Sequence, residues 1–192
     1  MKMGKTVLFA MVAAALTSSS AFAAVDGGSG KITFTGDVIS APCAIKAEDV
    51  DKQVDLGEVP ASYINSKGHS DAVDASIHLV DCDLPNSDNG EGTQTKVTKV
   101  DVTFTSTAVT TEGENLLSNT MTGGATGVGV RLLDGEGQNI TLGTAKTVTL
   151  VQASSEQTLP FQAYMELVDS TKATPATPGA VASNATYVLS YK

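Results

Sequence analysis

The sequence predicts an all-β fold of the β-sandwich class. Three observations lead to this prediction: Val, Thr and Ile are abundant, clusters of Gly, Asn, Asp and Ser interrupt the chain at short intervals, and the intervening segments alternate apolar with polar residues. One domain of about seven strands accounts for the pattern, and the sequence contains no internal repeat. We expect the strands at residues 30–38, 74–82, 96–104, 127–133, 147–151, 157–167 and 187–191.

The first 23 residues have the features of a secretory signal peptide. Lys2 and Lys5 make the start positive, and residues 7–16 form an apolar run that is too short to cross a bilayer. Residues 21–23, Ala-Phe-Ala, match the small-x-small rule for cleavage. We therefore expect a mature chain that begins at Ala24, is exported, and contains no membrane span.

The segment 30–38 is the first expected strand, and it follows a Gly-rich leader near the free end of the mature chain. Its residues alternate between two faces with a period of two, which is typical of a strand. A strand in this position is well placed to pair with a neighbouring molecule. The face that is apolar or Gly consists of Gly30, Ile32, Phe34, Gly36 and Val38.

The chain is acidic, with a formal net charge of −9 before cleavage of the signal peptide. It has no cluster of basic residues, which argues against nucleic acid or an anionic membrane surface as a partner. Simple solubility is a sufficient reason for this charge.

Cys43 and Cys82 are the two cysteines of the chain. In an exported protein the default expectation is an intramolecular disulfide, which would close a loop of about 40 residues and stabilise the fold by on the order of 4 kcal/mol. A metal site and a catalytic thiol are the alternatives. Both are disfavoured because no CxxC spacing occurs and the chain has two histidines.

Between the strands we expect loops at residues 85–94, 110–124 and 170–179, and a short helical stretch at residues 60–65. The last strand, residues 187–191, alternates Tyr187, Leu189 and Tyr191 with polar or smaller residues and stops one residue before the end. A strong strand at a terminus is usually paired into a sheet.

The sequence offers no motif for catalysis or cofactor binding. The Gly-rich run at residues 123–129 lacks the Lys-Ser/Thr ending of a phosphate-binding loop and precedes a strand pattern. His69 and His78 are not accompanied by a nucleophile-elbow or oxyanion motif. We therefore predict that the protein is not an enzyme and binds no cofactor or metal.

With a signal peptide, an alternating first strand, a cysteine pair and a strong last strand in this order, the sequence resembles the pilin subunits of chaperone–usher fimbriae of Gram-negative bacteria, of the type 1 and P-pilus kind. The similarity covers the whole mature chain. A penultimate Tyr and a Gly fourteenth from the C-terminus also belong to the family pattern, and Tyr191 and Gly179 occupy these positions. The remaining motifs are the signal peptide, Phe34-Thr35-Gly36, Ala41-Pro42-Cys43, residues 77–82 (IHLVDC), residues 161–164 (FQAY) and residues 185–192 (ATYVLSYK).

This resemblance implies an immunoglobulin-like sandwich that lacks its seventh strand and is completed by a donor strand from a partner. Residues 24–38 would be the donor-strand extension and residues 39–192 the pilin domain. Ile32, Phe34 and Val38 would enter a neighbour's groove, Gly36 would fit where that groove is shallow, and Gly30 would stand at the strand's start. The groove and chaperone-contact residues implied are Gly179, Tyr187, Leu189 and Tyr191.

The function implied is a structural subunit of an adhesive surface fimbrium, which polymerises head to tail by donor-strand exchange. Its partners would be other copies of itself, other pilin subunits, a periplasmic chaperone and an outer-membrane usher. The alternatives are a minor adaptor or tip subunit of the same system, and a secreted monomeric carbohydrate-binding sandwich. The absence of Trp and the aromatic content of 5% disfavour the carbohydrate-binding alternative.

Overall fold

The computed structural model describes residues 29–36, 38, 41–85, 96–110 and 115–192. The chain divides into two units, Met1–Val38 and Ile39–Lys192, which are considered separately. In the first unit, the described residues have extended backbone without regular secondary structure, and their side chains are exposed. The expected signal peptide lies outside the described residues, and most of the expected loop at residues 85–94 does as well.

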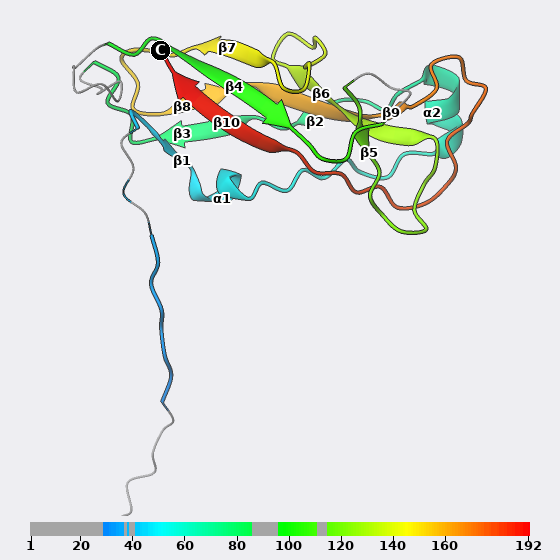
Figure 1. Cartoon of the computed structure of the whole chain (residues 1–192), viewed down its shortest axis with the longest axis horizontal. Helices are drawn as coiled ribbons and strands as arrows, with labels where there is room; N and C mark the ends of the chain where they lie inside the picture. Colours follow the sequence, from blue (N-terminus) through cyan, green and yellow to red (C-terminus); the bar gives the residue numbers. More distant parts are fainter. Residues whose placement is uncertain (1–28, 37, 39–40, 86–95, 111–114) are drawn as a thin grey trace, which may run out of the picture. The chain divides into compact units, whose positions relative to one another are not determined.

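The second unit consists mainly of antiparallel strands in three sheets (Figure 1). Two short helices, α1 (Ala47–Val50) and α2 (Ala61–Lys67), lie in the segment between β1 and β2. The first sheet has the strand order β1 (Ala44–Ile45), β3 (Ile77–Val80) and β8 (Gln157–Leu159). The second sheet has the order β10 (Thr186–Tyr191), β4 (Lys99–Thr105) and β7 (Ala145–Thr149). The third sheet has the order β2 (Val73–Asp74), β9 (Phe161–Leu167), β6 (Val128–Asp134) and β5 (Leu117–Ser118).

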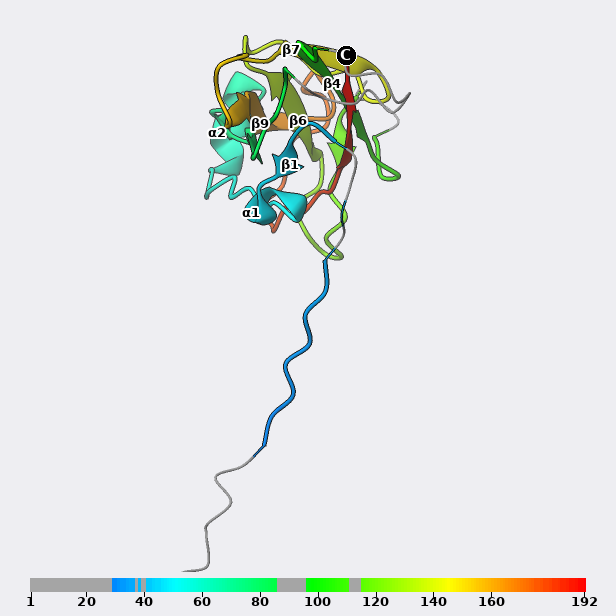
Figure 2. The same cartoon turned by 90° about the vertical axis from the view of Figure 1, so that its left-hand side faces the viewer.

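The sheets pack as two layers around an apolar core. Strand β4 directs Val100, Val102 and Phe104 inward, and all three are buried. Phe104 meets Phe161 of β9 edge to face with ring centroids 4.9 Å apart, so the contact joins the two layers. Strands β4 and β7 lie on one side of this unit and α1 on the other (Figure 2). The predicted β-sandwich is therefore confirmed.

Most strands lie where the alternating pattern predicts them, and the differences have local causes. The expected strand 157–167 is split into β8 and β9 at Pro160, which has no N–H to donate to a ladder. The expected strand 74–82 is split after Asp74, whose carboxylate accepts a hydrogen bond of 2.6 Å from the Ser76 hydroxyl. The helical stretch at residues 60–65 is confirmed as α2.

The expectation that residues 110–124 form only a loop is wrong in one part. This segment contains strand β5, which pairs with β6 and places Leu117 in the core. Its neighbour Leu116 is fully buried against Gly129, where a Cβ atom would come within 2.8 Å of the leucine side chain. Two adjacent buried leucines show no alternation, so periodicity did not reveal the strand.

The disulfide between Cys43 and Cys82 is present. It joins the residue before β1 to the second residue after β3, at the edge of the first sheet. A hydrogen bond of 2.8 Å from the Asp83 N–H to the Pro42 carbonyl continues the pairing beside it. The disulfide thus holds the start of the second unit to the sheet.

Replacing both cysteines by serine is expected to lower the free energy of unfolding by about 4 kcal/mol, because the loop they close spans 39 residues in sequence separation. Urea unfolding of the full chain at pH 7 measures this change. Dithiothreitol should destabilise the wild-type chain by a similar amount and leave the double variant unchanged. A double variant as stable as wild type would contradict the prediction.

Candidate functional site: an open apolar groove

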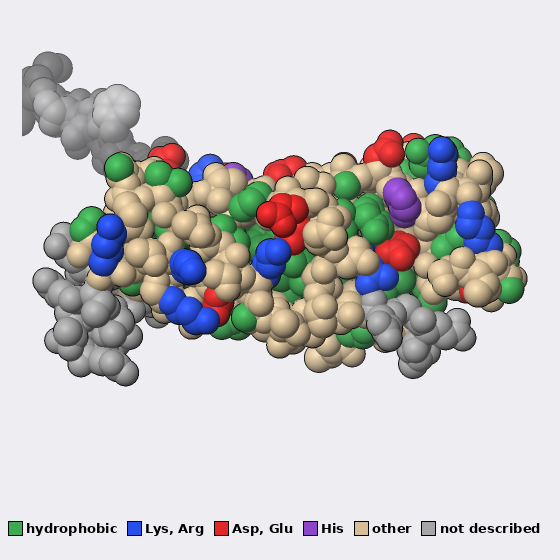
Figure 3. Space-filling model, turned by 90° about the horizontal axis from the view of Figure 1, so that it is seen from above, with side chains coloured by type: hydrophobic (Ala, Val, Ile, Leu, Met, Phe, Trp, Pro, Cys, Tyr) green, Lys and Arg blue, Asp and Glu red, His purple; other side chains and the backbone are tan. Residues whose placement is uncertain are grey.

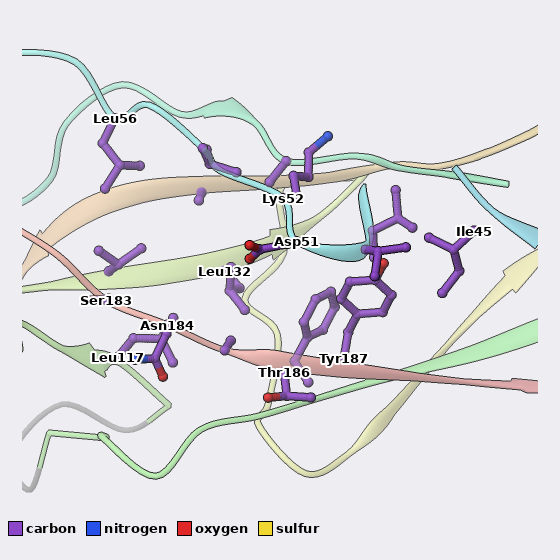
Figure 4. Close-up of a pocket in the computed structure, with 18 residues that line it drawn as sticks. Ile45, Asp51, Lys52, Leu56, Leu117, Leu132, Ser183, Asn184, Thr186 and Tyr187 are labelled. Atoms are coloured by element: carbon purple, nitrogen blue, oxygen red, sulfur yellow. The ribbon is translucent and has the colours of Figure 1, made fainter. Parts of the chain in front are cut away.

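A cavity of about 590 Å³ opens between two segments of the second unit. One segment, residues 45–64, is named the first wall, and the other, residues 176–187, the second wall. Figure 4 shows Leu56, Asp51 and Lys52 on the first wall across from Ser183, Asn184 and Thr186 on the second. The floor between the walls is apolar and includes Ala75, Ile77, Phe104, Leu117, Val130, Leu132 and Ala163.

A second, smaller cavity of about 310 Å³ lies between the same two walls. Its lining comes from residues 59–64 of the first wall and 176–181 of the second, whereas the larger cavity uses residues 45–56 and 183–187. The two are therefore arranged in series along one groove, and we call them the first chamber (about 590 Å³) and the second chamber (about 310 Å³). The junction between them lies near Leu56 and Val59 on one wall and near Val181 and Ser183 on the other.

Strand β10 begins in the last two residues of the second wall and continues to Tyr191, and one of its edges is unpaired in the described part of the chain. Its other edge pairs with β4 throughout, from Thr186 opposite Thr105 to Tyr191 opposite Val100. Lys192 and Lys99 exchange both backbone hydrogen bonds, at 2.9 and 3.0 Å. Since such pairs alternate along an antiparallel ladder, every second residue of β10 turns its N–H and C=O away from β4. These residues are Tyr187, Leu189 and Tyr191.

The same three residues direct their side chains toward the core, where they are partly buried. The free edge of β10 therefore presents unpaired backbone donors and acceptors beside an uncovered apolar floor. An extended segment that pairs with this edge satisfies the backbone groups and covers the floor with its own apolar side chains. The arrangement has the geometry to accept a β-strand, and the residues that line it include no convergent set of titratable groups of the kind found in a catalytic site.

The two walls are tied together at Tyr187. Its hydroxyl donates a hydrogen bond of 2.7 Å to the backbone carbonyl of Asp49 on the first wall. The ring thus crosses the groove and ends the first chamber. Burial raises the pKa of the Tyr187 hydroxyl, so the hydroxyl stays protonated and keeps its donor role at neutral pH.

Asp49 is the centre of a buried hydrogen-bond cluster that holds the first wall to β3. Its side chain is fully buried. The carboxylate accepts hydrogen bonds of 2.6 Å from Lys52 Nζ and 2.6 Å from the backbone N–H of His78, and His78 Nδ1 lies 2.8 Å away. Burial alone would raise the pKa of Asp49, but the hydrogen bonds from Lys52 and His78 hold it below its ordinary value.

The cluster also explains why β1 is short. Lys46 still donates its N–H to the His78 carbonyl, at 2.9 Å, but the His78 N–H bonds the Asp49 carboxylate instead of continuing the ladder. The chain therefore leaves the sheet after Ile45 and forms α1. From there it runs along the groove as the first wall.

A second tie between the walls lies beyond the second chamber. The Asn65 side chain of α2 donates to the Ala176 carbonyl at 3.0 Å and accepts from the Ala176 N–H at 2.7 Å. Asn119 similarly accepts from the Ala182 N–H at 2.9 Å and donates to the Ala180 carbonyl at 3.0 Å. The irregular part of the second wall is therefore held in place by two asparagine side chains.

The residues predicted for the groove lie in different parts of the structure. Tyr187 lines the first chamber and Gly179 the second. At Gly179 a Cβ atom would lie 2.4 Å from the Ala125 nitrogen, so no side chain fits there. Leu189 and Tyr191 pack against the main core and line neither chamber. Burial raises the pKa of Tyr191 to about 12.

The residues predicted for the donor strand lie in the first unit, where their apolar side chains face solvent. Ile32 is 76% exposed, Phe34 is 88% exposed, and Val38 is fully exposed. Exposure of three large apolar side chains at alternate positions is costly unless a partner covers them.

The sequence interpretation did not identify the first wall. Val50, Val54 and Leu56 line the first chamber, and together with Lys52 they alternate at every second position. That period-two signal was available in the sequence, but no strand was expected in this segment. The role of Asp49 was not predictable from the sequence, because apart from Lys52 its partners His78 and Tyr187 lie 29 and 138 residues away.

The two histidines have structural roles. His69 stacks on Tyr164 with ring centroids 4.9 Å apart, and His78 belongs to the Asp49 cluster.

Within the described residues, no group of three potential metal ligands occurs. No helix in the same part of the chain is both long and apolar enough to cross a membrane. On the face shown in Figure 3, positive and negative side chains are intermingled.

Comparisons with known proteins agree with this geometry. Residues 32–192 match the family model described as Fimbrial protein. The chain is 52% identical over 190 residues to the fimbrial-like protein YbgD of Escherichia coli K12, an alignment that covers 98% of each chain. It is 33% identical over 199 residues to the A chain of the type-1 fimbrial protein of the same strain, with 100% of each covered.

Two solved structures have a similar fold. A chain from a chaperone–usher pilus superposes with a TM-score of 0.70 and 28% sequence identity, covering 88% of this chain and 98% of that one. The P pilus rod subunit PapA superposes with a TM-score of 0.64 and 27% identity, covering 79% of this chain and 100% of PapA.

The substitution Asp49→Asn is expected to destabilise the fold by about 1.5–3 kcal/mol at pH 7, because hydrogen bonds to the charged carboxylate are lost. The pKa of Asp49 is lower in the folded state than in the unfolded chain. Its stabilising contribution is therefore complete above the unfolded pKa, near 3.8, and is lost as the pH falls through the lower folded value. Urea unfolding between pH 2 and pH 7 measures the difference.

A matched control is Glu48→Gln. Glu48 pairs with Lys46 at 2.6 Å, but both side chains are about half exposed, so this change should alter stability by less than about 0.5 kcal/mol. A difference between wild type and Asp49→Asn that stayed constant down to pH 2 would contradict the assignment.

Proposed function

Since the chain belongs to the fimbrial protein family and is a structural subunit of chaperone–usher pili, we propose that it polymerises by donor-strand exchange. In this reaction the extension of one subunit, residues 24–38, fills the groove of the next. The observation that carries the proposal is the free edge of β10 beside an uncovered apolar floor. The fold is the incomplete immunoglobulin-like sandwich of its structural neighbours, and the extension supplies the strand that this sandwich lacks.

The sizes of the extension's side chains fit the two chambers in one order. Ile32 and Phe34 occupy the larger first chamber and Val38 the smaller second chamber, while Gly36 crosses the junction between them. The disulfide anchors the second unit only a few residues beyond Val38. The contact joins unlike surfaces of two copies, so repetition produces an open fibre rather than a closed ring.

Burial of the extension supplies the driving force. Each of Ile32, Phe34 and Val38 contributes roughly 1.5–3 kcal/mol when it moves from water into the groove. The backbone groups of Tyr187, Leu189 and Tyr191 gain partners at the same time. The gain is large because both surfaces are exposed beforehand.

An unfilled groove is an aggregation hazard, since an unpaired edge beside apolar side chains recruits any extended chain. We propose that a periplasmic chaperone covers the groove first and that an outer-membrane usher exchanges it for the next subunit's extension. The mature chain then reaches the cell surface as part of a fimbrium. There the assembled fibre mediates adhesion.

We assign the subunit to the fibre shaft. An extension to donate together with a groove to accept indicates an internal position in the fibre. The similarity to the type-1 A chain and to the PapA rod subunit favours the same assignment. The second candidate is an adaptor near the tip. Immunogold labelling of intact cells distinguishes them: label along the whole fibre supports the shaft assignment, and label at the tip alone overturns it.

The substitution Phe34→Asp in the full mature chain is expected to abolish fibre formation, because it would bury an unpaired carboxylate in the first chamber. Electron microscopy and size-exclusion chromatography measure fibre content. The control is Thr35→Asp, which adds the same charge on the outward face of the extension and should leave assembly intact. Normal fibres from the Phe34→Asp chain would refute the proposal.

The Phe34→Asp subunit should still accept a donor strand, because its groove is unchanged. Added in excess to wild-type subunits, it is expected to shorten their fibres, since it can end a fibre but cannot extend one. A chain that lacks residues 24–38 is expected to act in the same way. Extension of fibres by that truncated chain would show that the donor segment lies elsewhere.

A further inference from the structure

The second wall, like the extension, alternates large and small residues at the positions that face the groove. Val181, Ala185 and Tyr187 pack inward against the core clusters. Asn184 and Thr186, which lie between Ser183, Ala185 and Tyr187, are exposed and border the first chamber without packing against the core. Gly179 and Ser183 line the two chambers at the remaining positions of this series. The inward series of the wall is therefore Gly179, Val181, Ser183, Ala185 and Tyr187.

The residues on the apolar face of the extension, Gly30 to Val38, have a complementary order of sizes when the extension runs antiparallel to the second wall. On one face of an antiparallel pair, residues directly opposite each other have Cβ atoms about 4.5–5.5 Å apart, so two large side chains compete for the same floor. In one register every large residue meets a small one. The pairs are Gly30–Tyr187, Ile32–Ala185, Phe34–Ser183, Gly36–Val181 and Val38–Gly179.

Neighbouring registers fail this test. A shift of two residues in one direction places Ile32 against Tyr187 and Val38 against Val181. A shift in the other direction places Phe34 against Val181. A parallel strand in the same span places Val38 against Tyr187. Each alternative therefore opposes two large side chains at one position, which a packed core does not accept without strain.

Tyr187 is the most restrictive position of the series, because its ring cannot easily move aside. The hydroxyl is hydrogen-bonded to the Asp49 carbonyl across the groove, and Asp49 is itself held by Lys52 and His78. The ring also lies beside Phe104, with centroids 6.3 Å apart. A large donor side chain opposite this ring would therefore meet a group that is held in place.

From this geometry we propose that Tyr187 is a specificity-determining residue of the groove and selects donor strands with glycine at the position of Gly30. The inference rests on the proposed polymerisation and adds the register to it. It identifies the occupant as residues 30–38 of a second copy of this chain. Gly30 is thus required for its lack of a side chain and does not serve merely as a flexible start of the strand.

The test is a pair of compensating substitutions in the full mature chain. Gly30→Val places a branched side chain against the ring and is expected to slow fibre formation at least about tenfold, as overpacking in a core does. Tyr187→Ala removes the ring, so the chain with both substitutions should assemble at a rate close to that of Tyr187→Ala alone. Light scattering gives the rates and electron microscopy confirms fibres.

Three control variants distinguish an effect of the strand register from a general loss of folding or assembly. Lys31→Val changes the neighbouring outward position and should assemble as wild type. Tyr187→Phe keeps the ring and loses the hydrogen bond, so it should not rescue Gly30→Val. Gly36→Val should not be rescued by Tyr187→Ala, because Gly36 lies opposite Val181. Rescue of Gly36→Val instead of Gly30→Val would overturn the register.

A peptide experiment decides the case in which Tyr187→Ala fails to fold. A synthetic peptide of residues 29–40 should cap wild-type fibres and stop their growth. The same peptide with Gly30→Val should need at least about tenfold higher concentration, and the peptide with Lys31→Val should act as the unmodified one. Equal capping by all three peptides refutes the role of Tyr187. If the wild-type chain neither polymerises nor is capped, the proposed function itself is wrong.

Discussion

The unpaired edge of β10 is the constraint on which the rest of this structure depends. A sheet edge whose free backbone groups lie beside apolar side chains is stable only when another strand covers it. The inward residues of β10 contribute to the core from one side, and no described strand contributes from the other. The fold is therefore an incomplete sandwich, and the proposed polymerisation by strand exchange follows from that deficiency.

The groove keeps its shape because polar groups tie its walls together at both ends. The Asp49 cluster and the Tyr187 hydroxyl hold one end, and Asn65 bound to Ala176 holds the other. These ties use backbone carbonyls and N–H groups that would otherwise lack partners at the points where the walls leave regular strands. A preformed groove lowers the entropic cost of binding a strand. In the proposed strand exchange, the apolar floor would supply affinity, and the ties would determine where the incoming side chains have room.

Sequence reasoning succeeded where one local pattern decided the structure. Alternation located β9 and β10, whose more buried and less buried residues alternate along the strand. It also located β4 and β6, because their apolar residues alternate with polar residues or Gly, although residues on both faces of β6 are buried. It missed β5, because the adjacent residues Leu116 and Leu117 are both buried and therefore show no alternation. It also missed the first wall, whose apolar residues alternate with charged ones in a segment that belongs to no sheet. Signals of this kind become interpretable only when the covering elements are known.

By itself, the sequence determined the class of fold, the pairing of two cysteines expected in an oxidising compartment, and the size pattern of the extension from Gly30 to Val38. Each depends on neighbours in the chain or on composition. The tertiary structure decided the groove: its two chambers, the position of the first wall, and the hydrogen bond from the Tyr187 hydroxyl to the Asp49 carbonyl. Those features arise from residues far apart in sequence, such as Asp49 and Tyr187, 138 positions apart. Their proximity depends on how the sheets pack, and local periodicity carries no information about that packing.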